Sequence, residues 1–174
     1  MDEGWSRWLL EEHGFSFTSV RNADIHAGEL TDRYDVIVLP SERVGSLMNG
    51  FANGSAPPQY VGGIGAEGIR ELDNFVQAGG TLVCLSASAD LCIDEFHLPV
   101  SNVVRGLGRG DFFSSGSILE VRTDTGHPVM AGMPDRAKVF FNRSPVFTTE
   151  EGFEGSVIAS YGPAGSPLMS GYLL

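Results

Sequence analysis

Two spacings of apolar residues alternate along the first half of the chain. Residues 2–13 and 66–77 carry apolar side chains at helical intervals, and a glycine follows each segment within two residues. Residues 34–40 and 81–85 are instead short, continuous apolar runs. Helices that alternate with fully apolar strands are typical of a parallel sheet covered by helices on both faces. The pattern therefore predicts an α/β fold.

Further elements complete this prediction. A short strand is expected around residues 15–20 and a short helix around 89–96. The run YDVIVLP at 34–40 has no polar alternation, so we expect a strand buried on both faces. Between the expected elements, residues 41–64 are rich in Gly, Asn, Ser and Pro and predict a long irregular segment.

After Pro99 the pattern changes to strand-like pieces, which read SILEVRTD, KVFFN, SVIASY and LMSGYLL. No internal repeat and no shift in composition divides the chain, so we expect one domain over residues 1–174. A crossover helix normally joins two parallel strands, yet the first helix has no strand before it. The last apolar piece also stops in mid-pattern. We therefore expect a domain truncated at both ends.

Composition narrows the classes of partner. The chain has 174 residues, 42% of them hydrophobic, and a net charge of −11 with Lys138 as its single lysine. A surface this acidic repels nucleic acid and anionic lipid. The sequence contains neither an apolar run of ~20 residues that could span a bilayer nor the pattern of a signal peptide. We expect neither nucleic-acid nor membrane binding.

The stretch from Gly62 to Asp90 carries the most information about chemistry. It predicts a glycine-rich turn, a helix, a buried strand and then a corner of small residues at 84–88, with the sequence CLSAS. In α/β hydrolases and amidotransferases, such a corner holds a nucleophile between two glycines that relieve a strained backbone. Both glycines are absent here. Cys84 and Cys92 match no zinc or redox spacing, and we expect both to be buried thiols.

Three motifs in order connect this chain to a known family. They are DEGW at residues 2–5, PPQYVGGIGAEG at 57–68 and HPVMAGMP at 127–134. Together they resemble the class I glutamine-amidotransferase-like domain that follows the catalytic domain in some bacterial zinc carboxypeptidases of the carboxypeptidase A type. The resemblance implies a flavodoxin-like, mostly parallel sheet that lacks a strand before residue 1 and a strand and helix after the end.

The resemblance also implies a function. The chain would be a non-catalytic accessory or docking domain, and an exported metallocarboxypeptidase would hold its zinc in a catalytic domain upstream. By the same alignment Ser86 stands at the position of the nucleophilic cysteine, and Ser41-Glu42 stands where active relatives carry a Gly-Gly oxyanion loop. No His-x-Glu pair is present. We therefore expect no catalytic residue, metal or cofactor in this chain.

Two alternatives remain open. The chain could be a small hydrolase or amidotransferase relative in which His127 activates Ser86, because a serine nucleophile needs a positioned base. His127 also fits a structural role, since it lies in a turn-rich linker. The second alternative is a sugar- or peptide-binding module that uses residues 41–64 and the strand ends.

Smaller features point to structural roles. The formal GxGxxG match at Gly63, Gly65 and Gly68 does not follow a strand directly, as a dinucleotide site requires. His13, His26 and His97 are scattered and have no zinc spacing. In each of the pairs Phe112-Phe113 and Phe140-Phe141 we expect one ring to pack inward.

Overall fold

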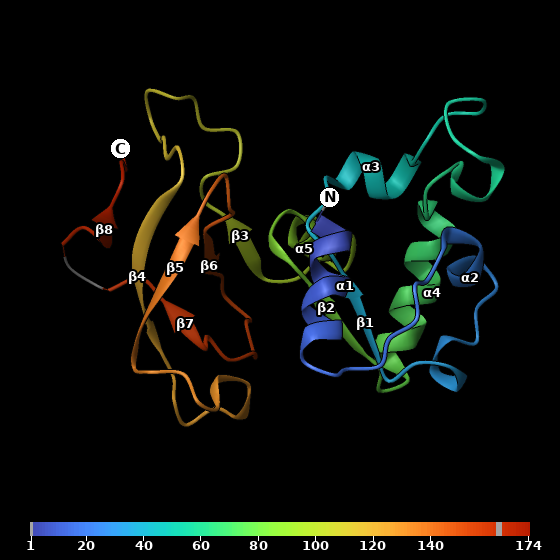
Figure 1. The fold of residues 1–174 in the computed structure, drawn as a ribbon, viewed down its shortest axis with the longest axis horizontal. Coiled ribbons are helices and arrows are strands. Elements are labelled where there is room, and N and C mark those ends of the chain that lie inside the picture. Colours follow the sequence, from blue (N-terminus) through green and yellow to red (C-terminus); the bar gives the residue numbers. More distant parts are fainter. Residues whose placement is uncertain (1, 163–164) are drawn as a thin grey trace. The chain divides into compact units, whose positions relative to one another are not determined.

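The computed structural model describes residues 2–162 and 165–174, and the chain divides into two compact units, Met1–Leu98 and Pro99–Leu174. Figure 1 shows the helices in the first unit, in blue to green, and mostly strands in the second, in yellow to red. The prediction of one domain over residues 1–174 stays a prediction, because two compact units can still fold cooperatively. None of the described helices is long and apolar enough to cross a membrane.

The N-terminal unit holds five α-helices and two strands among its described residues, together with three short 3₁₀ turns. In chain order the helices and strands are α1 (Asp2–Glu12), α2 (Asn22–His26), β1 (Val36–Leu39), α3 (Val44–Asn49), α4 (Gly65–Gln77), β2 (Thr81–Cys84) and α5 (Ala89–Glu95). The helices predicted at 2–13, 66–77 and 89–96 are confirmed. The predicted strand at 15–20 is wrong, since those residues form no regular element, and the segment 41–64 contains α3.

A pair of parallel strands forms the centre of this unit. β1 and β2 pair in register from Val36 opposite Thr81 to Leu39 opposite Cys84. Ile37 and Leu39 are buried, whereas Val36 and Val38 are 52% and 41% exposed. The prediction that β1 is buried on both faces is wrong, because alternate side chains point to opposite faces and one of these is exposed.

Helix α4 contributes three residues to the core of the N-terminal unit. Its periodic residues Ile69, Leu72 and Phe75 are buried, and the helix packs against α2, α3 and β2. The buried cluster comprises Ile25, Leu30, Ile37, Leu39, Ile64, Ile69, Leu72, Phe75, Leu91 and Cys92. Helix α1 behaves differently, since none of its residues is buried.

The C-terminal unit is built from short antiparallel strands. They are β3 (Val100–Asn102), β4 (Ser117–Thr123), β5 (Arg136–Phe141), β6 (Phe147–Thr149), β7 (Ala159–Ser160) and β8 (Leu168–Ser170). β4 pairs antiparallel with β5, β7 and β8, and β3 pairs antiparallel with β6. Ser117, Leu119 and Val121 alternate along β4 and are buried, which is the period of a half-buried strand.

The predicted fold class is therefore wrong. A flavodoxin-like, mostly parallel sheet with helices on both faces is not what forms, because β1–β2 is the single parallel pair among the described strands. The apolar pieces after Pro99 follow one another through loops, and parallel neighbours would need a long crossover connection between them. Without crossover helices these pieces pair antiparallel.

Candidate functional site

The predicted corner lies at the C-terminal edge of the β1–β2 pair. Leu39 and Cys84 face each other at the last register position. Parallel strands bring their carboxyl ends to the same edge, which is where α/β sheets bind ligands. The segment after β1 begins with Pro40 and Ser41, and the segment after β2 contains Ser86 in the 3₁₀ turn Ser86–Ser88.

The backbone at Ser86 is strained. Its φ is +51°, in the left-handed region that residues other than glycine adopt rarely and at a cost of about 1–3 kcal/mol. A nucleophile elbow also places its serine or cysteine on a strained strand-to-helix turn. The corner thus keeps the backbone shape of an elbow without the flanking glycines.

Ala87 and Ser88 form hydrogen bonds within the corner. The Ala87 N–H donates to Ser41 Oγ at 3.4 Å. The buried Ser88 hydroxyl shares its single proton between two carbonyl oxygens, Leu39 O at 3.0 Å and Leu85 O at 2.9 Å, which ties the turn to β1. In an active elbow, the amide after the nucleophile points at the developing oxyanion. Here the amide that follows Ser86, that of Ala87, donates to Ser41 Oγ instead.

The predicted base does not share a unit with Ser86. His127 belongs to the C-terminal unit, where its Nδ1 accepts a hydrogen bond from the Val129 N–H at 3.3 Å and caps a 3₁₀ turn, Pro128–Met130. In the N-terminal unit, His13 and His26 bond to the backbone carbonyls of Leu9 and Ile64. The contacts of His13 and His127 are local, whereas that of His26 ties α2 to the start of α4 across 38 positions.

The two cysteines lie on either side of this corner. Cys84 ends β2, Cys92 lies in α5, and the two are joined as a disulfide. The prediction of two free buried thiols is wrong, because the turn after β2 reverses the chain and returns α5 to the end of the strand. The spacing of the two cysteines in the sequence did not indicate that they form a disulfide.

A thiol titration tests the pairing directly. We expect the native chain, purified without reductant, to show no reactive thiol after unfolding in denaturant. Prior reduction should release two thiols, because the chain has two cysteines and both are paired. Two thiols without reduction would contradict the disulfide.

Gly63 and Gly68, two of the three GxGxxG glycines, have packing roles, whereas Gly65 has open space beside it and a φ of +55°. A Cβ on Gly63 would collide with the backbone of Leu47 and Met48 at the end of α3. A Cβ on Gly68 would lie 2.7 Å from Cβ of Ile64. These glycines allow the loop and α4 to approach their neighbours closely, which accounts for the motif without a nucleotide.

A pocket of about 360 Å³ opens in the C-terminal unit. Its lining includes Arg109, Phe112, Phe113, Phe141, Asn142 and Arg143, from the loop before β4 and the end of β5. Phe141 is buried and Phe140 exposed, as predicted for that pair, whereas Phe112 and Phe113 are both half-buried. In the sequence, Arg109 lies close to the pair Phe112-Phe113, which could have marked one side of this pocket. No local pattern connects these residues with residues 141–143.

The described residues contain no group of three or more His, Cys, Asp or Glu side chains that could hold a metal ion. No protein-family model matches the chain, and neither a curated protein nor a solved structure matches it. The resemblance to the carboxypeptidase-associated domain therefore stays a prediction.

Proposed function

We propose that this chain is a non-catalytic accessory module of a longer protein. The observation that supports this most is the bond from the Ala87 amide to Ser41 Oγ. An elbow needs that amide for the oxyanion, and losing one such donor typically lowers kcat by about 10²–10³. With Glu42 following Ser41, a developing negative charge would also meet a carboxylate.

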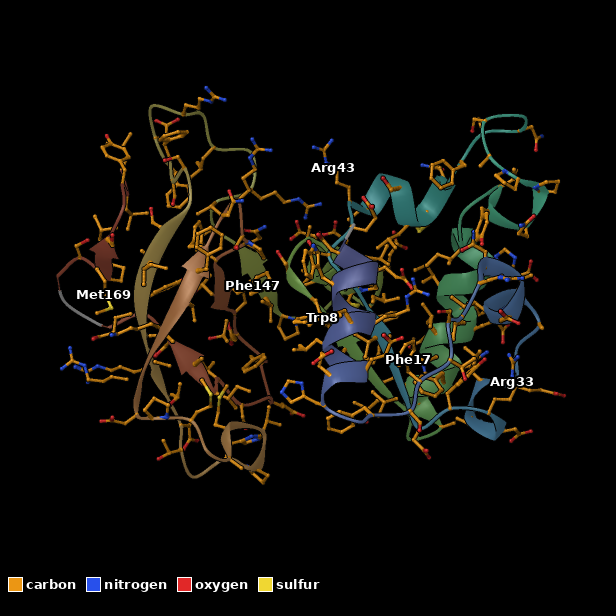
Figure 2. All side chains as sticks on the ribbon, in the orientation of Figure 1. Trp8, Phe17, Arg33, Arg43, Phe147 and Met169 are labelled. Atoms are coloured by element: carbon orange, nitrogen blue, oxygen red, sulfur yellow. A yellow bond between two sulfur atoms is a disulfide. The ribbon has the colours of Figure 1, made fainter. Side chains whose placement is uncertain are left out.

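We propose further that the parent is an exported bacterial zinc carboxypeptidase, on the strength of the three motifs at residues 2–5, 57–68 and 127–134. Its peptidase domain would hold the zinc and would be the docking partner. Helix α1 offers a surface for such docking, because Trp5 and Trp8 are 63% and 51% exposed, and Figure 2 labels Trp8 on this helix. Large exposed aromatic side chains often mark interaction sites.

The coding sequence upstream of residue 1 tests whether the longer protein is a zinc carboxypeptidase. We expect the reading frame upstream of residue 1 to encode a His-x-x-Glu zinc motif with a more distant histidine. A complete upstream frame without that motif would reject the carboxypeptidase parent but leave the non-catalytic role standing.

Hydrolysis assays decide between the accessory module and the alternative enzyme. The strained Ser86 favours that alternative, in which His127 would be the base. We expect purified chain to hydrolyse p-nitrophenyl acetate and γ-glutamyl-p-nitroanilide at the same background rate as Ser86→Ala and His127→Ala. A rate that falls by about 10³ or more in both variants, with unchanged circular dichroism, would establish catalysis and reject the proposal.

A further inference from the structure

We propose that the pocket of the C-terminal unit binds a small aromatic carboxylate. The pocket lies wholly within residues 109–143, so its form depends on the C-terminal unit alone. No residue of the corner at Ser86 lines this pocket. The proposal is independent of whether that corner is catalytic.

Aromatic rings form the apolar part of the pocket. Phe141 is the buried last residue of β5, and Phe112 meets it edge-to-face with ring centroids 5.9 Å apart. Phe113 stands against Tyr172 at 6.1 Å, which fixes a second ring beside the first. Phe141 is only 2% exposed, so the partly exposed rings of Phe112 and Phe113 are the ones that can contact a further ring. The pocket is thus built to accept an aromatic group.

Two guanidinium groups form its polar part. Arg109 lies 5.7 Å from the centroid of the Phe113 ring, an arrangement that holds the cation beside the apolar surface. Arg143 follows β5 with φ +54°, a strained conformation of the kind that clusters at ligand sites. Among residues 2–162 and 165–174, neither arginine forms an ion pair.

Another arginine of the same unit has a carboxylate partner, in contrast to these two. Arg136 bonds both carboxylate oxygens of Glu120, at 2.7 and 2.8 Å, and that hydrogen bond raises the pKa of Arg136. Two arginines that line one pocket without such a partner are complementary to an anion from outside the chain. Asp111, the acidic residue of that loop, does not line the pocket.

Size and charge select the class of anion. Small-molecule sites begin at about 300 Å³, so 360 Å³ suits one ring with a short acidic arm. The planar fork of a guanidinium matches a carboxylate with two parallel hydrogen bonds. The acidic remainder of the chain disfavours polyanions such as nucleic acid. A monocarboxylate with an aromatic ring satisfies both parts of the pocket.

Four probes on the full chain test the proposal by NMR titration. We expect 3-phenylpropionate to shift amide signals of residues 109–115 and 141–143 saturably. The neutral 3-phenylpropionamide should bind about tenfold more weakly, and propionate, which lacks the ring, should produce no saturable shift. Phenyl phosphate serves as a fourth probe, and equal or tighter binding of it would overturn the choice of carboxylate.

Single Arg→Gln substitutions test whether 3-phenylpropionate binds in this pocket. Arg109→Gln and Arg143→Gln should each weaken 3-phenylpropionate binding about tenfold, the usual value of one charge-assisted contact. Arg122→Gln removes the same charge from an exposed position of β4 outside the pocket, and its affinity should stay within about twofold of the parent chain. The proposal fails if the shifts map elsewhere, if the amide binds equally well, or if all three variants respond alike while retaining native spectra.

Discussion

Replacing Phe75 by alanine should lower the free energy of unfolding by about 3–5 kcal/mol. Phe75 is only 2% exposed on α4, in the middle of the core of the N-terminal unit. The chain turns closely around its ring, since a Cβ on Gly80 would collide with it. Truncation would therefore remove apolar contacts and leave a cavity that a tight turn cannot fill. Urea unfolding followed by far-UV circular dichroism measures the change.

The matched control for Phe75 is its neighbour on the same helix. Val76 is 40% exposed, so Val76→Ala should change the free energy of unfolding by no more than about 0.5 kcal/mol. Equal effects of the two substitutions would mean that α4 does not present the face described above. Total stabilities of domains are about 5–15 kcal/mol, so Phe75→Ala should leave the N-terminal unit close to unfolding.

Replacing Ser117 by alanine should destabilise the C-terminal unit by about 1–3 kcal/mol, the usual cost of unsatisfied buried polar groups. Ser117 is 1% exposed on β4. Its hydroxyl donates to Tyr172 O at 2.7 Å and accepts from the Tyr172 N–H at 3.0 Å. The Ser114 hydroxyl also donates to it at 3.2 Å. Alanine would break all three contacts and release the segment after β8 from β4.

Hydrogen exchange distinguishes this effect from a general loss of stability. We expect the Tyr172 amide and its neighbours to exchange faster in Ser117→Ala, while the amides of α4 stay protected. Ser156→Ala is the control, because Ser156 is an exposed serine of the same unit and outside its strands. Unchanged exchange at Tyr172 would show that the Ser117 hydroxyl does not anchor this segment.

The candidate sites were predictable to different degrees. The corner at Ser86 could be located from sequence, because an apolar run, a glycine-rich helix start and a cluster of small residues are local signals. The sequence marked Ser41-Glu42 through the missing Gly-Gly pair, but the bond from the Ala87 N–H to Ser41 Oγ joins residues 46 positions apart. The pocket at Arg109 and Arg143 joins a loop to the end of another strand, and no local pattern reports such a meeting.

What the sequence determined by itself is the set of local elements and their apolar faces. The helical spacing at 66–77 and the runs at 34–40 and 81–85 correspond to α4, β1 and β2, since periodicity is a local property of the chain. The tertiary structure alone decided which strands pair and in which direction, which thiols meet and which arginines lack a partner. Those outcomes depend on contacts between distant segments, where many pairings bury similar apolar area and the connections between strands decide among them.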